Sequence, residues 1–308
     1  MVTAFPENPK NKFVFTTSKR INENENNQKY ILAREEADQI LKNNPDLVRV
    51  ATMPDTIRLQ KDNDFLTVLK RTFVDINSAQ YHGNWKGHKF AVAHGLGELS
   101  DTEVLKEKWN TMQRYGFIPI DKEFFKYISK QDSQIAVYTF KEMRDGKIKD
   151  RTQPRIIIAE VKKDKDFEII PSDKQISISL AKEYGIFQMF AGGVDDANEL
   201  ADYYQNIQGR DEIYVIHRLD STGFKKPVGR PLSRYDNGVC GGSYIDDGGV
   251  FAVVGDGVAN NSAAGATAQK IKTIDDTINI NDEQKVIYKG LEYQSNGPFL
   301  VPKMYLKK

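Results

Sequence analysis

The pattern of apolar and polar positions along the chain predicts strands over most of its middle and its end. Residues 89–94 and 155–161 are short apolar runs rich in β-branched side chains, and residues 176–180 alternate between apolar and polar positions. The Asp145-Gly146 pair is typical of a tight turn between strands. Further segments of the same character are residues 12–17, 65–74, 135–140, 166–170, 212–217, 285–288 and 299–301.

Helical patterns are fewer and do not follow the strands in a regular order. Residues 33–43 carry acidic side chains early and a lysine late, the order that the helix dipole favours. Ser100-Asp-Thr-Glu103 forms a capping box ahead of an amphipathic stretch at residues 102–114, and residues 121–128 and 196–207 predict two more helices. A doubly wound parallel sheet, which needs regular alternation, is therefore disfavoured. We predict a mainly β protein, a jelly-roll-like antiparallel β-sandwich with peripheral helices.

Two segments differ from the rest of the chain in composition. Residues 1–30 are polar and rich in asparagine, which predicts an extended N-terminal arm. Glycines are concentrated between Arg234 and Lys270, and no other basic residue stands between these two. We therefore expect a glycine-rich insertion at about residues 222–282 within a single domain that spans residues 31–308.

The charge balance narrows the function classes. The 308 residues include 44 Lys and Arg against 43 Asp and Glu, so the formal net charge is only +1. A dedicated nucleic-acid binder has a basic excess, so no nucleic-acid partner is expected. A chain near its pI of 7.7 has little net repulsion between copies and tolerates self-association.

The sequence carries no targeting signal that we recognise. Its first residues lack a charged start followed by an apolar run, and its apolar runs have the length of strands. We therefore expect neither a signal peptide nor membrane insertion. Cys240 is the only cysteine, which excludes an intramolecular disulfide and a thiolate metal cluster.

One motif is compatible with metal-dependent cleavage of nucleic acid. Glu160-Val-Lys162 ends an apolar strand, as the Glu-x-Lys pair of a Mg²⁺-dependent nuclease does. Such a site needs a further carboxylate, for which Asp145 and Asp150 are available, although both fall in a predicted turn. The simpler interpretation is a strand that leads into a charged hairpin, and the sequence favours it.

The remaining candidate groups do not combine into a catalytic site. His82, His88 and His94 are spaced six apart, but glycines interrupt any regular strand there, so we expect ordinary surface or turn histidines rather than a metal site. The His94-Gly-Leu-Gly97 turn lacks the third glycine of a dinucleotide-binding fingerprint. Cys240 lies in a predicted loop without an evident base and is a candidate for an intermolecular disulfide. We predict no catalytic residue, no cofactor, no metal site and no enzymatic activity.

Several stretches, taken together and in order, resemble one protein family. They are residues 64–75, 84–90, 107–121, 175–182, 213–221, 286–293 and 297–300, followed by Tyr305. This order is similar to that of the polyhedrins and granulins of baculoviruses over residues 60–221 and 284–305. Trp85-Lys86-Gly87 and Ser179-Leu-Ala-Lys182 carry most of the resemblance.

The chain also departs from that family. A long segment intervenes where the family has a short acidic turn before its final strands, and no basic nuclear-import cluster stands near the N-terminus. The sequence therefore resembles a divergent member of the nudivirus type.

The resemblance implies a structural protein that assembles with itself. Proteins of that family form trimers that pack into a crystalline occlusion body, which embeds and protects enveloped virions and dissolves at alkaline pH in the host gut. The expected partners are then further copies of the chain and the virions, in occlusion bodies in the nucleus of infected cells. The candidate assembly residues are Trp85, Lys86, Gly87, Cys240, Tyr288, Tyr293 and Tyr305.

Two alternatives stay open: a non-crystalline capsid or matrix protein of a virion, and, less favoured, a Mg²⁺-dependent nuclease that uses Glu160 and Lys162. The assembly hypothesis carries its own pH dependence, because the chain has 14 Tyr and many of its basic residues are Lys. At about pH 10.4 roughly half of the lysines and over half of the tyrosines are deprotonated. The net charge then falls to roughly −20, and packed copies repel one another.

Overall fold

The computed structural model describes part of the chain residue by residue. These residues are 13–17, 29–83, 89–113, 116–121, 124–125, 135–160, 164, 167, 173–218, 226–241, 249–255, 258, 286–288, 291–296 and 299–302. The chain divides into two units, residues 1–264 and residues 265–308.

The helices of the first unit are short, and four of them begin at a side chain that accepts a hydrogen bond from an N–H group of the first turn. They are α1 (Lys29–Asn43), α2 (Met53–Leu59), α3 (Asn63–Leu69), η1 (Glu98–Ser100), α4 (Thr102–Trp109), α6 (Phe140–Arg144), α7 (Ile178–Glu183), α8 (Gly185–Ala191), α9 (Val194–Asp202) and the π-helical turn η3 (Tyr203–Ile207). None of the helices in the described part of the chain has the length and apolar character needed to cross a membrane.

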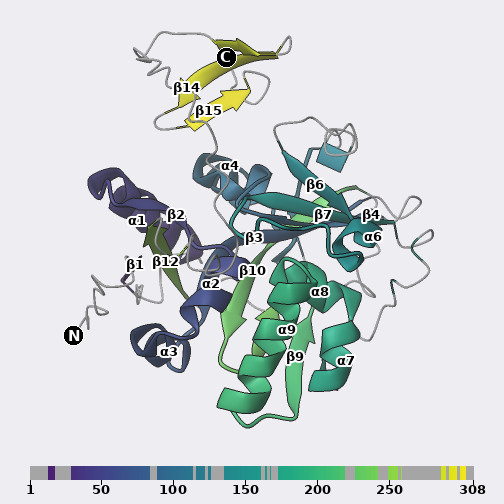
Figure 1. Ribbon diagram of the computed structural model, residues 1–308. Coiled ribbons are helices and arrows are strands. Elements are labelled where there is room, and N and C mark those ends of the chain that lie inside the picture. The colour runs from purple at the N-terminus through teal and green to yellow at the C-terminus, as the bar shows by residue number, and fades with distance from the viewer. Residues whose placement is uncertain are drawn as a thin grey trace. The chain divides into compact units, whose positions relative to one another are not determined.

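Twelve strands are described in the first unit (Figure 1). They are β1 (Phe13–Phe15), β2 (Leu47–Val50), β3 (Val74–His82), β4 (Lys89–His94), β5 (Ile118–Pro119), β6 (Ala136–Thr139), β7 (Arg155–Glu160), β8 (Asp173–Ser177), β9 (Glu212–Ile216), β10 (Val228–Tyr235), β11 (Gly238–Cys240) and β12 (Val250–Gly255).

These strands form one mixed sheet, which we call the main sheet. Its neighbours run in the order β6-β7-β4-β3-β10-β11-β9-β8, β5 pairs with β10, and β12 pairs with β1, β2 and β3. Three of the pairs, β6–β7, β11–β9 and β12–β3, are parallel. The other described pairs of the main sheet are antiparallel, so the sheet is mixed rather than purely antiparallel. The parallel strands are joined by connections that cross over rather than by hairpins.

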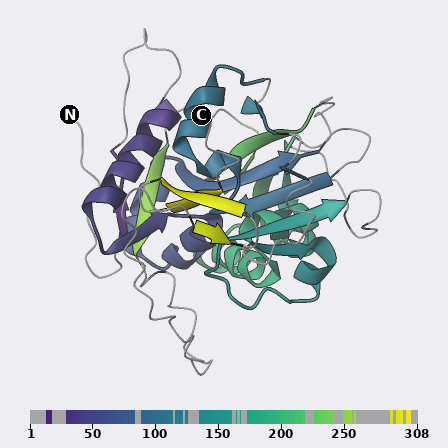
Figure 2. The same ribbon diagram turned by 90° about the horizontal axis from the view of Figure 1, so that it is seen from above.

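Helices cover both faces of the main sheet, as Figures 1 and 2 show. Successive residues of a strand point to opposite faces, so Ala79 and Tyr81 of β3 pack with α1 and α4, whereas Val74 and Ile76 pack with α8 and α9. The chain is thus mainly β, with one large mixed sheet and peripheral helices, which confirms the coarser part of the predicted fold class.

The second unit contains a separate antiparallel meander of three strands. These are β13 (Val286–Tyr288), β14 (Leu291–Asn296) and β15 (Phe299–Pro302), in the order β13-β14-β15. Tyr288 is opposite Leu291, and Tyr293 is opposite both Val286 and Pro302. The strands predicted at residues 285–288 and 299–301 are confirmed.

One predicted strand is wrong. Residues 65–74 form the end of α3 and the approach to β3, because Asp62 caps the helix by accepting hydrogen bonds from the N–H groups of Asp64 and Phe65. Phe65, Val68 and Leu69 are all buried, which is the spacing of a helix face.

The strand predicted at residues 176–180 is also wrong in its second half. The Ser177 hydroxyl accepts a hydrogen bond from the Leu180 N–H and starts α7, so the alternation ends there. The helix predicted at residues 196–207 exists as α9 but begins earlier, at Val194, and continues as the π-helical turn.

The glycine-rich segment is part of the core in its described residues. It provides β11 and β12, every residue of which is buried, and β12 joins β1 and β2 to β3. Within the insertion expected at about residues 222–282, residues 226–241 and 249–255 thus contribute core strands rather than a surface loop. The strand predicted at residues 12–17 of the arm is confirmed as β1, which pairs with β12 and buries Phe13 and Phe15.

Candidate functional site: the strand-end edge of the main sheet

Several strands of the main sheet begin or end at one edge, which we call the strand-end edge. The end of β3, at His82, lies opposite both the start of β10, at Val228, and the start of β4, at Phe90. Lys89 of β4 lies opposite Glu160 at the end of β7. The parallel strands β9 and β11 run toward the same edge, where β8 begins opposite the end of β9. The segments that join these strands, residues 84–88, 161–172, 217–227 and 242–248, therefore all start from this edge.

A buried glutamine links three of these strands below the edge. Gln80 of β3 is fully buried, and its Nε2 donates to the carbonyl oxygens of Gly241 and, at 3.2 Å, of His217. Its Oε1 accepts no hydrogen bond from any described residue. Gly241 must be glycine, because a Cβ there would lie 2.8 Å from Leu232 Cδ2. Gln80 therefore fixes where β9 and β11 end.

More polar side chains surround Gln80 in an otherwise apolar layer. His82 lies two positions further along β3, with its ring 5.2 Å from Phe90 and 5.0 Å from Phe117. Arg230 of β10 is opposite Gln80 in the ladder, and His217 Nε2 is 2.8 Å from the Tyr184 hydroxyl. All of these polar side chains are less than 5% exposed. Buried polar groups of this density are typical of the floor beneath a binding surface.

His94 does not belong to this cluster. It lies four ladder positions away from His82, with Nδ1 2.8 Å from the Ser78 hydroxyl and Nε2 3.0 Å from the Met189 carbonyl oxygen. Burial, helped by the Arg155 charge, lowers the pKa of His94 to about 3, so the ring is neutral. His94 is therefore a buried structural histidine. The prediction of surface or turn histidines is wrong for His82 and His94, which are buried in β3 and β4, and His88 lies outside the described residues.

A second polar cluster contains ion pairs and lies on the helical side of the main sheet. Arg155 of β7 and Asp196 of α9 are each 1% exposed and 2.9 Å apart, and Arg151 contacts Glu199 at 2.7 Å and also bonds Asp196. The guanidinium of Arg155 also donates to the Gly192 carbonyl oxygen at 2.8 Å. These contacts attach the loop before β7 to the start of α9.

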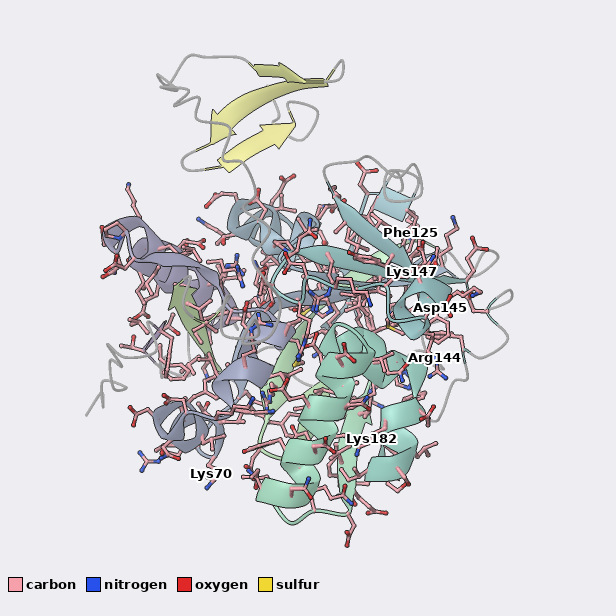
Figure 3. All side chains as sticks on the ribbon, in the orientation of Figure 1. Lys70, Phe125, Arg144, Asp145, Lys147 and Lys182 are labelled. Atoms are coloured by element: carbon pink, nitrogen blue, oxygen red, sulfur yellow. The ribbon has the colours of Figure 1, made fainter. Side chains whose placement is uncertain are left out.

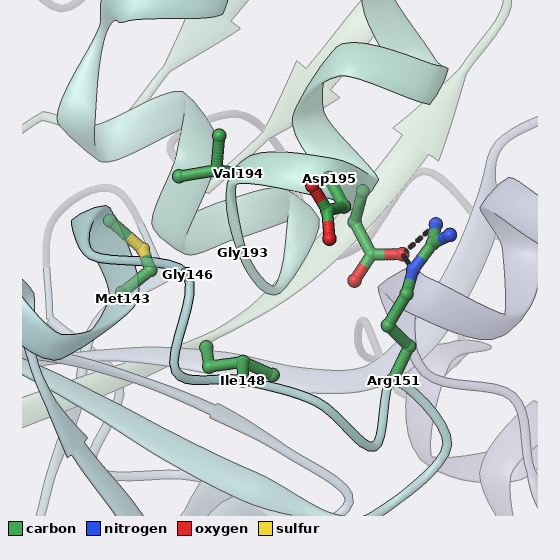
Figure 4. A pocket seen from close by; sticks show the side chains of 8 residues that line it. Met143, Gly146, Ile148, Arg151, Gly193, Val194 and Asp195 are labelled. Atoms are coloured by element: carbon green, nitrogen blue, oxygen red, sulfur yellow. Dashed lines mark hydrogen bonds and ion pairs between the residues drawn. The ribbon is translucent and has the colours of Figure 1, made fainter. Parts of the chain in front are cut away.

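A surface pocket of about 250 Å³ opens beside this cluster (Figure 4). It is lined by Met143, Gly146, Ile148, Arg151, Gly193, Val194, Asp195 and Asp196. The carboxylate of Asp196 accepts from Arg151 at 2.8 Å, and Asp195 is exposed. Two carboxylates at the start of α9 disfavour an anion there, and the guanidinium disfavours a cation. The side chains that line the pocket therefore favour neither an anionic nor a cationic ligand.

The residues of the nuclease hypothesis do not converge. Asp145 is bound to Lys141 at 2.6 Å, and Asp150 accepts from the Thr152 N–H at 2.8 Å. Glu160 lies 3.9 Å from Lys89, and Lys162 lies outside the described residues. Within the described ranges, no group of three or more His, Cys, Asp or Glu side chains is arranged to hold a metal ion.

The predicted assembly residues fall in different places. Cys240 is in β11 rather than in a loop and is only 3% exposed, because the parallel ladder with β9 buries it. Its thiol is therefore not presented for an intermolecular disulfide in this conformation. Tyr288 and Tyr293 lie in β13 and β14. Trp85, Lys86, Gly87 and Tyr305 lie outside the described residues, although the first three belong to a segment that starts from the strand-end edge.

The sequence did not identify the cluster around Gln80. The residues that meet there are far apart along the chain, with His217 137 residues and Gly241 161 residues beyond Gln80. A glutamine between apolar neighbours in residues 74–82 is the only local signal, since a central strand rarely buries an amide without a partner.

Comparison with known proteins places the fold but not the family. No known family matches the chain, and no curated protein matches it. A solved structure from Nanoarchaeota, described as accommodating massive sequence variation by the C-type lectin fold, matches with a TM-score of 0.50 and 16% sequence identity. The match covers 72% of this chain and 92% of that chain. At this identity the likeness shows a shared fold alone.

Proposed function

We propose that the chain is a recognition module in which a rigid C-type lectin-like scaffold presents the segments of the strand-end edge to a partner. The observation that carries this proposal is the convergence of the strand ends around the buried Gln80 cluster. The nanoarchaeal structure is described as accommodating sequence variation on this fold, which supports a division between a fixed core and variable segments.

The proposal is tested by exchanging the segments. Residues 84–88 and 242–248 are replaced with unrelated sequences of the same length, and the variants are compared in thermal unfolding and on glycan and peptide arrays. We expect the melting temperature to change by no more than about 4 °C, since surface segments contribute little. Binding seen with the original chain is expected to disappear.

The matched control replaces Asp236 and Asn237 in the β10–β11 turn, away from the strand-end edge, and is expected to retain binding. Array binding that survives every exchange at the edge contradicts the proposal.

Self-assembly is a second candidate function, favoured by the near-equal numbers of positive and negative groups. Charged side chains of both signs lie at α6 and α7, among them Arg144, Asp145, Lys147 and Lys182 (Figure 3). In this proposal copies form trimers and then a crystalline occlusion lattice around virions. The jelly-roll-like sandwich that accompanies the resemblance has no support in the mixed main sheet.

Expression in insect cells distinguishes the two candidates. Assembly predicts refractile intracellular crystals that are insoluble near neutral pH and dissolve abruptly in alkali. A recognition module without assembly remains soluble at every pH at which it is folded. A soluble product that cleaves DNA with Mg²⁺ contradicts both candidates and supports the nuclease.

A further inference from the structure

The main sheet has a junction at Asp75, where β12 joins β3. The parallel ladder between these strands has only two positions, Val250 opposite Val74 and Phe251 opposite Asp75, together with a 3.0 Å bond from the Val250 N–H to the Phe73 carbonyl oxygen. The remaining partners of β12 are β1 and β2. This short ladder therefore connects the β1–β2–β12 part of the sheet to β3.

The Asp75 carboxyl lies in the junction and is 4% exposed. Its Oδ1 accepts from the Ser233 hydroxyl at 2.9 Å, and its Oδ2 has no hydrogen-bond partner among the described residues. The backbone of Gly249 lies against it, since a Cβ there would be 2.8 Å from Asp75 Cγ and 2.9 Å from the Phe73 carbonyl oxygen. A carboxylate in this position has one hydrogen bond where an exposed carboxylate has several from water.

The charged and titratable groups around this carboxyl are few. Among the described residues, Arg230 from β10 is the cation whose charge acts on it, and Tyr30 from α1 is close enough that the Asp75 charge raises the pKa of the phenol. Arg34 of α1 lies over the Phe251 ring, 5.7 Å from its centroid, and pairs with Asp38 at 3.6 Å. None of these groups is placed to form a close ion pair with Asp75 in the contacts that the structure gives.

We propose that Asp75 is a pH-sensitive latch that holds β12 on β3 when its carboxyl is protonated and loosens this junction when the carboxyl ionises. Ionisation places a charge with one hydrogen bond in a dry junction, and opening of the junction gives that charge access to water. The described residues on either side of residues 242–248 lie against β3 and its approach: Gly241 accepts a hydrogen bond from Gln80, and the Val250 N–H donates to the Phe73 carbonyl oxygen, two positions before Asp75. The latch therefore acts on one of the segments that we propose as a recognition element.

The sign of the pH dependence follows from the two states of the junction. Burial raises the pKa of the closed-state carboxyl to about 7, against the opposing effects of Ser233 and Arg230, and the ordinary value is 3.8. The closed state thus binds the proton more tightly than the open state. Opening increases about tenfold per pH unit between these two values and becomes constant above the higher one.

Hydrogen exchange in the full chain tests the latch. Protection factors, which remove the pH dependence of chemical exchange, are compared between pH 4 and pH 8 for the amides of β1 and β12 and for those of β7 as an internal reference. We expect protection in β1 and β12 to fall by at least a hundredfold, with a smaller change in β7. In Asp75→Asn the difference in protection between the amides of β1 and β12 and those of β7 is expected to be independent of pH. The exposed control Asp195→Asn is expected to behave like the original chain.

A second variant keeps the test valid if Asp75→Asn folds poorly. Ser233→Ala removes the hydrogen bond that favours the ionised carboxyl and so raises the closed-state pKa further. The fall in protection is then expected to begin at the same pH, to continue to higher pH and to become larger. Protection in β12 that is independent of pH, or that follows β7 throughout, overturns the latch. The same conclusion follows if Asp75→Asn retains the pH response. The readout is amide protection, so it is independent of whether the strand-end edge binds a partner.

Discussion

Single buried charges in this protein differ in how well their neighbours compensate them. Asp55 accepts from Arg49 at 2.7 Å and from Arg58 at 2.6 Å. Burial alone raises its pKa, but these two cations outweigh burial and lower it to about 2. Asp75 is equally buried but has one hydroxyl and a more distant arginine, so its pKa is raised to about 7. The number of donors at the carboxylate, rather than burial, decides the direction.

The ion pair between Arg155 and Asp196 gives the first prediction. Asp196→Asn leaves the buried Arg155 guanidinium without its carboxylate partner and unable to turn to solvent, whereas Arg151 retains its contact with Glu199. We expect a loss of about 3–5 kcal/mol in the free energy of unfolding, measured by urea denaturation. The neighbouring Asp195 is exposed, so Asp195→Asn is expected to change the stability by less than about 0.5 kcal/mol. Equal effects of the two substitutions contradict the assignment of Asp196 to a buried pair.

His94 and Asp75 give opposite contributions to the pH dependence of stability. The pKa of His94 is lowered to about 3 from 6.5, so only the unfolded state gains its proton and stability decreases as the pH falls below 6.5. The pKa of Asp75 is raised to about 7 from 3.8, so its contribution is complete below 3.8 and is lost as the pH rises through 7. The two slopes, each up to about 1.4 kcal/mol per pH unit, therefore oppose each other between pH 4 and 6.5.

This opposition gives the second prediction. The stability of the original chain is expected to be nearly constant between pH 4 and 6.5. Asp75→Asn removes the slope that Asp75 contributes, so the stability of this variant is expected to rise with pH by up to about 1.4 kcal/mol per pH unit. Chemical denaturation at each pH measures this stability. Adding His94→Gln to this variant is expected to remove the slope again. A flat profile for Asp75→Asn alone means that His94 is not the opposing group.

At the scale of elements, the local sequence pattern predicted a helix or a strand correctly where the pattern favoured only one of the two. The strands predicted at residues 89–94 and 212–217 are present as β4 and β9, and the helix predicted at residues 33–43 lies within α1. Residues 65–74 have a β-branched composition and were predicted as a strand, but the structure has a helix there that begins after Asp62 and buries one face in the core.

The joining of distant elements could not be predicted locally. The β12 strand pairs with β1, which precedes it by more than 200 residues, and neither strand contains a signal for the other. Three of the glycines that suggested an inserted loop, Gly238, Gly241 and Gly249, have neighbours that leave little room for a Cβ. Gly238, for example, has no room for a Cβ, which would lie 2.9 Å from Tyr214 Cβ. The Gln80 cluster depends on the same kind of long-range strand pairing, so the sequence did not reveal this cluster either.

The start of α4 gives the third prediction. The sequence placed the helix cap at Ser100, but Ser100 Oγ donates to the Leu96 carbonyl oxygen, and Asp101 accepts from the N–H groups of Glu103 and Val104. Asp101→Ala is expected to lower the free energy of unfolding by about 1 kcal/mol, measured by thermal or urea denaturation. Asp101→Asn, which retains a capping oxygen, should restore most of it, and a larger loss in Ser100→Ala would place the cap where the sequence did.

At the scale of the whole molecule, the tyrosines change how alkali is expected to act. Burial raises the pKa of Tyr30, Tyr81 and Tyr204 above the ordinary value of 10.0. These three phenols therefore stay protonated in the folded chain near pH 10.4, and the negative charge gained there comes mainly from loss of lysine charge and from other tyrosines. The charge-repulsion mechanism keeps its sign but loses part of its magnitude.

The same burial gives each copy a separate route to alkaline instability. A phenol whose pKa is higher in the folded state binds its proton more tightly there, so its contribution is complete below pH 10 and is lost as the pH rises further. Three such groups give a slope of up to about 4 kcal/mol per pH unit, which is large beside a total stability of about 5–15 kcal/mol. Alkali is thus expected to unfold the chain itself, and any assembly of it dissolves as a consequence.

Tyr30 gives the fourth prediction, because a phenylalanine there keeps the ring that stacks on Trp109 at 5.6 Å and removes the titrating group. Circular dichroism and tyrosinate absorbance are followed together between pH 9 and pH 12.5. In the original chain the last tyrosines are expected to ionise only as the ellipticity is lost. In Tyr30→Phe the alkaline slope of stability should decrease by about 1.4 kcal/mol per pH unit, which moves the unfolding midpoint to higher pH. The control is Tyr214→Phe in β9, whose side chain is half-buried, and it should leave the midpoint unchanged. If ionisation is complete before any ellipticity is lost, dissolution of an assembly has to come from repulsion between folded copies instead.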